Sequence, residues 1–329
     1  MNKKVNMLKN IISLSVVLML LNCENKNKNI PTTQDAEPLK AELEYKIESD
    51  LGEGAIWNYK TSELYWIDIE KKNLNIYNPK TKINNSISMP SRIGTVVPFT
   101  DNEVVSALED GVYKTNLKTG ASTLFVDMKQ ALTDSRLNDG KCDPSGRFWV
   151  GSMHLEQIEG RAKLYSINNE GELNMKIDSV TISNGIVWTA DKTKMYYIDT
   201  PTSEIKVYDF DNATGKISNG KVAVKIAEDL GFPDGMTIDE NDMLWVGMWN
   251  GNAVIQFNPI TGKVIQKIEV PAHNITSCAF GGPDLKTLYI TSARVDMTDE
   301  ELKQYPLAGS VFKVTPGVKG VKSSFYKAN

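Results

Sequence analysis

Short apolar runs rich in Val, Ile, Tyr and Trp recur along the chain, separated by residues typical of turns. From Ala41 onward no stretch keeps the 3.6-residue period of an amphipathic helix. Each run has the length of a β-strand, and Gly, Asn, Asp and Pro lie between the runs, as hairpin connections require. The pattern predicts an all-β domain.

The runs also repeat as a larger unit. The shared pattern is a polar residue and Gly, an apolar run, a turn with Asp or Gly, and a second apolar run with an aromatic residue, and some copies match it more weakly. The anchors of the copies are residues 54, 94, 140, 185, 235 and 277. They lie about 40 to 50 residues apart, the length of a propeller blade. We therefore predict a six-bladed β-propeller from about Ala41 to Phe325, closed by pairing of the segment Glu42 to Ile47 with the last blade.

The first residues have the pattern of an export signal. Lysines precede an apolar run from Ile11 to Leu21 that is too short to span a bilayer. The run ends in Leu20-Leu21-Asn22-Cys23, which resembles a lipoprotein box, although Asn22 replaces the small residue usual before the cysteine. An ordinary secreted protein with an incidental cysteine is the alternative.

These features set the expected domain limits and location. We expect residues 1–22 to be a lipoprotein signal peptide, Cys23 to be lipidated, residues 23–40 to be a flexible tether and residues 41–329 to be the propeller. The protein would then be exported and anchored by lipid to a bacterial membrane, either periplasmic or surface-exposed. We expect a monomer with no other membrane contact.

Composition and charge narrow the classes of partner. The chain is 41% hydrophobic and 24% charged, which suits a large folded core. Its 37 basic and 41 acidic residues are mixed, and the mature region has no basic block, which argues against nucleic acid. Cys142 and Cys278 lie far apart in different repeats, so burial as small apolar residues is favoured over a disulfide.

The repeat brings particular polar residues together, because equivalent positions of the innermost strands converge on the propeller axis. The residues before the anchors are Glu53, Ile93, Asp139, Asn184, Asp234 and Thr276. Carboxylates and an amide fill four of these positions and no cation fills any, so a bound metal would offset their repulsion.

Turns offer a second interpretation of the same dipeptides, since Asn-Gly and Asp-Gly are strong hairpin signals. A central metal site is favoured for two reasons. These residues recur at one position of the repeat, and Glu53 has no preference for turns. Oxygen ligands suit calcium first, with magnesium, manganese or zinc also open.

Several motifs resemble the regucalcin, gluconolactonase and luciferin-regenerating enzyme family, in the right order and over nearly the whole mature chain. The motifs are Leu51-Gly52-Glu53-Gly54 with Trp57, Arg136-Leu137-Asn138-Asp139-Gly140-Lys141 with Asp143-Pro144-Ser145-Gly146-Arg147, Ser183-Asn184-Gly185, Pro233-Asp234-Gly235-Met236 and Thr276-Ser277-Cys278-Ala279-Phe280-Gly281-Gly282. The resemblance implies a six-bladed propeller that acts as a metal-dependent lactonase.

The resemblance also implies roles for individual residues. Glu53, Asn184 and Asp234 match the metal ligands of the family, and Asp234 also matches its general base. Arg136 and Asn138 match the pair that hydrogen-bonds the hydroxyls and ring oxygens of a sugar substrate.

Three further residues match less closely or are given weaker roles. Glu156 matches a substrate contact on a loop over the pocket, in a stretch that varies within the family. Asp139 and Asp296 are assigned supporting roles.

The function expected from these residues is metal-dependent hydrolysis of a sugar (aldono-) lactone, such as gluconolactone, to the free sugar acid. The metal would act as Lewis acid, and Asp234 would take a proton from water. The alternatives are a phosphotriesterase-like hydrolase on the same site and a non-catalytic calcium- or sugar-binding lipoprotein. A Ser/His/Asp triad is disfavoured, because neither His154 nor His273 accompanies a nucleophile motif.

The tryptophans lie mostly in strand runs, so we expect them to pack between blades. Trp249 is the expected exception and a candidate for stacking on sugar, because Met248-Trp249-Asn250-Gly251 leads from a strand into a turn.

Overall fold

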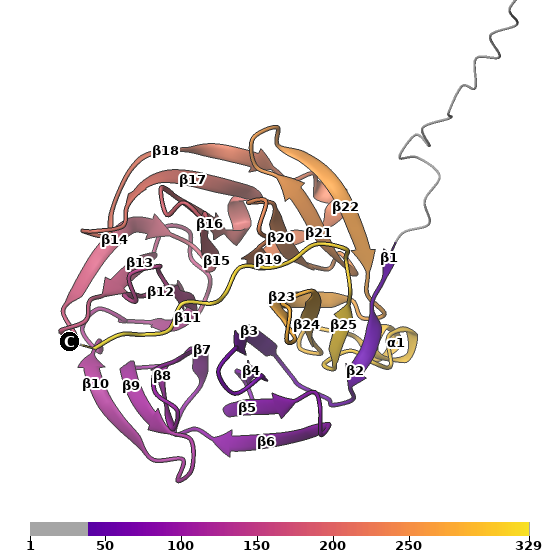
Figure 1. The fold of residues 1–329 in the computed structure, drawn as a ribbon, viewed down its shortest axis with the longest axis horizontal. Helices are drawn as coiled ribbons and strands as arrows, with labels where there is room; N and C mark the ends of the chain where they lie inside the picture. The colour runs from indigo at the N-terminus through magenta and orange to yellow at the C-terminus, as the bar shows by residue number, and fades with distance from the viewer. Residues whose placement is uncertain (1–38, 329) are drawn as a thin grey trace, which may run out of the picture. The chain divides into compact units, whose positions relative to one another are not determined.

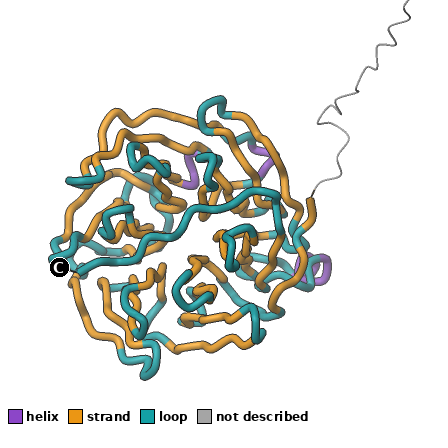
Figure 2. The backbone as a smooth tube through the Cα atoms, in the orientation of Figure 1, coloured by secondary structure: helices purple, strands orange, loops and turns teal. Residues whose placement is uncertain are grey.

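The computed structural model describes residues 39–328, in which six antiparallel sheets surround a common axis (Figure 1). Strands and turns make up nearly all of this region, as Figure 2 shows. The helical elements within it are the 3-10 turns η1 (Thr200–Thr202) and η2 (Glu228–Leu230) and the short helix α1 (Asp299–Gln304). The predicted all-β, six-bladed propeller is confirmed.

Each blade runs from an innermost strand at the axis to an outermost strand at the edge. Blade 1 contains β3 (Gly52–Asn58), β4 (Glu63–Asp68), β5 (Asn73–Asn78) and β6 (Ile83–Ser88), and blade 2 contains β7 (Ile93–Pro98), β8 (Glu103–Leu108), β9 (Gly111–Asn116) and β10 (Ser122–Asp127). Blade 3 contains β11 (Ser135–Cys142), β12 (Phe148–His154), β13 (Ala162–Ile167) and β14 (Leu173–Val180), and blade 4 contains β15 (Ser183–Trp188), β16 (Lys194–Asp199), β17 (Glu204–Asp211) and β18 (Lys216–Lys225). Blade 5 contains β19 (Phe232–Ile238), β20 (Leu244–Trp249), β21 (Ala253–Asn258) and β22 (Lys263–Glu269), and blade 6 contains β23 (Asn274–Gly281), β24 (Thr287–Ala293) and β25 (Val311–Val314).

The ring is closed by a strand from the start of the described chain. Strand β2 (Glu42–Tyr45) pairs antiparallel with β25 and becomes the outermost strand of blade 6. Joining the two ends of the chain in one sheet removes an exposed sheet edge. The predicted closure is confirmed.

Strand β1 (Leu39–Lys40) pairs parallel with β22, so the last two residues of the predicted tether, residues 23–40, belong to a sheet. The predicted signal peptide, Cys23 and the rest of the tether lie outside the described residues. Within residues 39–328 no helix has the length and apolar character needed to cross a membrane.

A strap formed by residues 315–328 crosses one face of the ring (Figure 1). Gly320 forms a β-bridge with Asp239 of blade 5, and Ser324 forms one with Cys142 of blade 3. Tyr326 is buried at the far end of the strap. The strap therefore ties together blades that lie far apart in the chain.

Large aromatic side chains fill the spaces between blades. Trp149 and Trp188 pack edge to face with ring centroids 5.7 Å apart, which joins blades 3 and 4, and Trp245 packs on Phe280 between blades 5 and 6. Trp249 is the one tryptophan that is not buried. The predicted packing role is confirmed for the other five, and Cys142 and Cys278 are both buried and free, as predicted.

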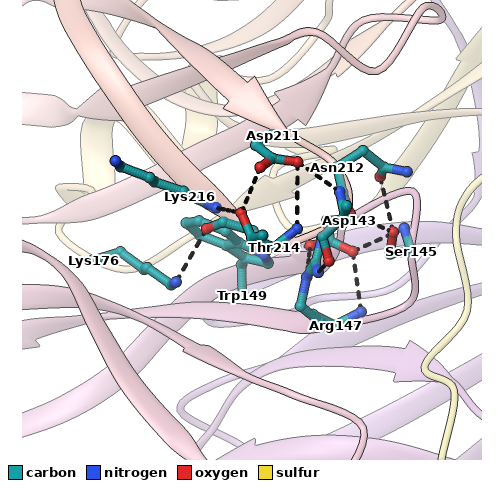
Figure 3. A network of polar contacts seen from close by, with 11 residues as sticks. Asp143, Ser145, Arg147, Trp149, Lys176, Asp211, Asn212, Thr214 and Lys216 are labelled. Carbon is teal, nitrogen blue, oxygen red and sulfur yellow. Dashed lines mark hydrogen bonds and ion pairs between the residues drawn. The ribbon is translucent and has the colours of Figure 1, made fainter.

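A buried aspartate fastens blade 3 to blade 4 (Figure 3). Asp143 accepts hydrogen bonds from Arg147 Nε at 2.6 Å and from Trp149 Nε1 at 2.9 Å. Arg147 in turn donates to the carbonyl oxygens of Asn212 and Ala213 in the β17–β18 turn. One carboxylate thus orients an arginine and a tryptophan that hold the neighbouring blade.

Replacing Asp143 by Ala should therefore destabilise the protein strongly. The variant leaves the guanidinium of Arg147 and the indole N–H of Trp149 without their partner in a buried setting, which costs about 3 to 5 kcal/mol of unfolding free energy. Urea denaturation measures this loss. Asp284→Ala is the control, because Asp284 is an exposed turn residue that caps only the backbone of Lys286, and it should cost about 1 kcal/mol or less. Equal losses in the two variants would contradict the assigned role of Asp143.

Candidate functional site

Every innermost strand loses register with its neighbour at the same point of the repeat. The breaks in pairing lie between Glu53 and Ile56, Ile93 and Thr95, Leu137 and Gly140, Ser183 and Ile186, Pro233 and Met236, and Ile275 and Cys278. A β-bulge of this kind releases residues from the ladder and redirects their side chains. The candidate site residues lie at these bulges.

The register corrects the repeat alignment in blade 3. The first unpaired residue there is Asn138, as it is Asn184 in blade 4 and Asp234 in blade 5. Asp139, which the repeat aligned with Asn184 and Asp234, is the second unpaired residue of its bulge. Glu53 pairs with Ile67 and lies one position before the first unpaired residue of blade 1, Gly54. The repeat follows the residue before the glycine, whereas a bulge is defined by pairing with the partner strand.

Two glycines allow the bulged strands of blades 4, 5 and 6 to approach closely. A Cβ atom on Gly185 would lie 2.9 Å from the carbonyl oxygen of Asp234, and one on Gly235 would lie 2.7 Å from Ser277 Oγ. Neither separation is tolerated by a real side chain. Glycine at the position after Asn184 and Asp234 is therefore what brings these two side chains to the same part of the channel.

Three carboxyl groups are buried together at the axis, namely Glu53, Asp139 and Asp234. Burial and the charge of Asp139 raise the pKa of Glu53 to about 7. Burial and the charge of Glu53 raise the pKa of Asp234 well above its usual range, and the two carboxyl groups share a hydrogen bond. The cluster therefore holds its protons tightly unless a cation replaces them.

Asp139 completes the cluster and is incompletely satisfied. One of its oxygens accepts a hydrogen bond of 2.7 Å from the backbone N–H of Gly140, whereas the buried Oδ2 has no partner among the described residues. Burial raises the pKa of Asp139 as well. An orphaned carboxylate oxygen in a channel of carboxylates is the environment expected next to a cation or its water.

A chain of hydrogen bonds fixes the amides beside the carboxyl cluster. Arg136 Nη1 donates to Asn138 Oδ1 at 2.7 Å, and Asn138 Nδ2 donates to Asn184 Oδ1 at 3.0 Å. Asn184 Nδ2 donates to Thr200 Oγ1 at 2.7 Å, and that hydroxyl donates to the carbonyl of Pro233. The chain orients the amide oxygen of Asn184 and joins blades 3, 4 and 5. Thr200 was not predicted, and no motif in its neighbourhood points to it.

The donor set suits a hard divalent cation. Glu53 and Asp234 offer carboxylate oxygens, Asn184 offers an amide oxygen, and the unpartnered Oδ2 of Asp139 lies in the same cluster. In residues 39–328 no group of three or more His, Cys, Asp or Glu side chains is arranged to hold a metal ion, so a site here needs the amide as a third ligand. The residues present fit such a cation.

A pocket of about 480 Å³ opens above this cluster. Its buried lining includes Glu53, Arg136, Asn138, Asn184 and Asp234, and the more exposed Asp296 also lines it. Predicted residues from four blades and the β24–α1 loop thus meet in one pocket.

Glu156, which was predicted to contact the substrate, and the two histidines do not line the pocket. Glu156 is exposed in the turn after β12, where its neighbours Leu155 and Gln157 line the pocket and it does not. His154 is buried and accepts a hydrogen bond from the backbone of Glu156, while His273 stacks on Tyr305. Substrate contact by Glu156 stays a prediction.

The pocket also contains charged residues that were not predicted. Arg92 Nη2 lies 2.9 Å from Glu70 Oε2, and Arg92 Nη1 lies 3.6 Å from Glu109 Oε1. Burial lowers the pKa of Arg136 to about 10, so it stays charged at neutral pH beside these pairs. Charged residues at the ends of strands have no recognisable spacing, which is why the repeat did not reveal them.

Comparison with known proteins agrees with this geometry. Residues 51–294 match the family described as the SMP-30/Gluconolactonase/LRE-like region. The chain belongs to this family. YvrE of Bacillus subtilis strain 168, which carries the name "Putative sugar lactone lactonase", is 40% identical over 274 residues, which are 83% of this chain and 94% of YvrE.

Solved structures of similar proteins share the whole fold. Regucalcin of Agrobacterium tumefaciens strain C58, described as a calcium-binding protein, superposes with a TM-score of 0.84 at 26% identity and covers 88% of this chain and 98% of its own. A luciferin-regenerating enzyme superposes with a TM-score of 0.81 at 30% identity and covers 87% of this chain and 99% of its own. The predicted family is confirmed.

The pKa of Glu53 predicts how the metal-free protein responds to pH. The folded-state pKa of about 7 lies above the ordinary value of 4.5, so the folded protein binds this proton more tightly than the unfolded chain does. The resulting stability is fully present below about pH 4.5 and is lost as the pH rises through about 7. We expect the unfolding free energy in chelator to fall by roughly a few kcal/mol over this range, as measured by urea denaturation.

Glu53→Gln is the control for this pH dependence. The amide cannot ionise, so the fall in unfolding free energy should become shallower. A fall that is equally steep in both proteins would mean that other groups cause it.

Proposed function

We propose that this protein is a lactonase that hydrolyses a sugar lactone to the free sugar acid with the help of a divalent metal. The observation that supports it most is the buried cluster of Glu53, Asp139 and Asp234 beside the Arg136–Asn138 pair, at the base of a pocket. The family match and a relative named as a lactonase also support the proposal.

Arg136 and Asn138 would bind and orient the substrate. Both are held in place by the hydrogen-bond chain to Asn184 and Thr200. Asn138 Nδ2 donates to Ser183 O and Asn184 Oδ1, so the donors left for a substrate are Nε and Nη2 of Arg136, while Asn138 Oδ1 can accept from a substrate hydroxyl. A guanidinium donor and an amide acceptor suit the ring oxygen and the hydroxyls of a sugar lactone. Pre-set orientation of this kind reduces the entropic cost of reaching the reacting geometry.

Asp234 would act as the general base. Its carboxylate would take a proton from water as the water oxygen bonds to the lactone carbonyl carbon. The ring C–O bond would then break as Asp234 returns the proton to the ring oxygen, which releases a hydroxy acid. The cluster around Asp234 favours its protonated form, so a cation is needed to keep it ionised at neutral pH. When bound by Glu53, Asn184 and Asp234, a divalent metal would supply polarisation of the lactone carbonyl.

Calcium is the metal that we propose first. All the candidate ligands are oxygens, and the similar regucalcin is described as calcium-binding. Magnesium, manganese and zinc are the other candidates, since carboxylate and amide oxygens bind each of them.

The proposed function predicts metal-restored lactone hydrolysis. A soluble form that begins after Cys23 is incubated with glucono-, galactono-, xylono- and arabinono-lactones, and acid release is followed with and without chelator. We expect turnover that chelator abolishes and one or more divalent metals restore. No turnover with any metal, in a folded protein that binds calcium, would exclude this function and favour a phosphotriester substrate or a binding role.

Asp234→Asn separates catalysis from binding. The amide keeps the shape of the side chain but cannot accept the proton, so kcat should fall by roughly 10² to 10⁴, while substrate binding, measured by calorimetry, is partly kept. Asp209→Asn, in β17 and outside this pocket, is the matched control and should retain activity. Unchanged turnover in Asp234→Asn would exclude Asp234 as the base.

A further inference from the structure

The pocket above the carboxyl cluster has two chemically different walls. Blades 1 and 2 supply the charged pair Glu70 and Arg92. Blades 4, 5 and 6, on the other side of the ring, supply a set of apolar side chains, with Thr200, Asn250 and Asp296 beside them. The apolar residues are Ile182, Pro201, Phe232, Trp249 and Val295. Leu155 of blade 3 extends this apolar wall.

The apolar wall is exposed although it is made of large side chains. Phe232 is 47% exposed and Leu155 is 54% exposed. Side chains of this size normally gain free energy by burial, at about 25 cal/mol for each Å² removed from water. A concentrated set of them in a pocket therefore marks a surface that is covered when a ligand is bound.

Phe232 and Trp249 form the centre of this wall and have no aromatic partners. They face each other across strands β19 and β20 as a directly opposed pair. Among residues 39–328 neither ring stacks on another, and the indole N–H of Trp249 donates to no protein acceptor. The other five tryptophans are all buried. Trp249 and Phe232 are thus available to a ligand that lies next to the carboxyl cluster.

We propose that this wall is a subsite for an apolar substituent of the substrate, so that the favoured substrate is a lactone carrying an alkyl chain. This inference rests on the proposed lactonase function and adds the chemical class of the substrate. The lactone ring would lie over Glu53, Asn184 and Asp234, with its polar side toward Arg136.

The alkyl chain would then lie along Phe232 and Trp249. A simple sugar lactone has hydroxyls on most of its carbons, so some of them would lose water against this wall without gaining a hydrogen-bond partner. An alkyl chain has no such cost and covers the exposed rings.

The test compares lactones that share one ring and differ only in the chain. γ-Butyrolactone, γ-hexanolactone and γ-nonanolactone have the same five-membered ring, with no tail, an ethyl tail and a pentyl tail. We expect kcat/KM to rise roughly three- to fivefold for each methylene that the wall covers, from about 0.8 kcal/mol per buried methylene. Where turnover is slow, the same series is ranked as inhibitors of gluconolactone hydrolysis.

Phe232→Ser should flatten this dependence on chain length. Ile260→Ser is the matched control, because Ile260 is 84% exposed in the β21–β22 turn and lies outside the pocket, and it should keep the full dependence. Both substitutions remove an exposed apolar side chain, so a general effect on folding or solubility would appear in both variants.

Fluorescence gives a readout that does not need turnover. The signal of Trp249 is the difference between the fluorescence of the wild-type protein and that of Trp249→Phe. γ-Nonanolactone should shift this signal to shorter wavelength, while γ-butyrolactone should not.

If gluconolactone is hydrolysed but chain length changes neither kinetics nor fluorescence, the subsite is excluded and the lactonase function stands. If no lactone is hydrolysed but the shift depends on chain length, the subsite is supported and the lactonase function is excluded.

Discussion

The innermost strands of six blades meet around one axis, and each strand loses register there. This shared bulge is the constraint on which the site depends. It brings Asn138, Asn184 and Asp234 to one level of the channel from three different blades, and glycines after two of them let the strands come close enough for the side chains to meet. A regular ladder would alternate these side chains between the two faces of each blade and would separate them.

Bringing carboxyl groups together at the axis has an electrostatic cost that the rest of the fold must offset. Three carboxyl groups are buried within the cluster, and burial alone disfavours their charged forms. The packing between blades and the connections across them, such as the Asp143–Arg147 contact and the strap ending at Tyr326, hold the ring closed around this unfavourable centre. A protein can keep such a strained polar centre when a bound cation later relieves it, which is why the cluster is better explained by ligand binding than by stability.

Much of this arrangement follows from the chain alone, and the reasons for the exceptions are physical. The blade period, ring closure, tryptophan packing and most pocket residues were predictable, because strand period and anchor spacing are local properties of the sequence. The offsets of Asp139 and Glu53 from the first unpaired residue of their bulges were not predictable, since a bulge is set by the partner strand. Thr200 could not be found either, because its role depends on Asn184 and Pro233 in neighbouring strands. Phe232 and Leu155 have the same sequence pattern as core residues, and only the fold shows that they are exposed.

The two walls of the pocket and its base come from different parts of the fold. The base is made by bulged residues of the inner strands, where a change in one residue disturbs a chain of hydrogen bonds that crosses three blades. The walls are made by strand ends and turns, whose side chains bond to few neighbours and can vary without moving the base. Reaction type and substrate choice therefore depend on different parts of the molecule. In this protein the wall formed by Phe232 and Trp249 is apolar where the opposite wall is charged, so a substrate that satisfies both must itself be polar on one side and apolar on the other.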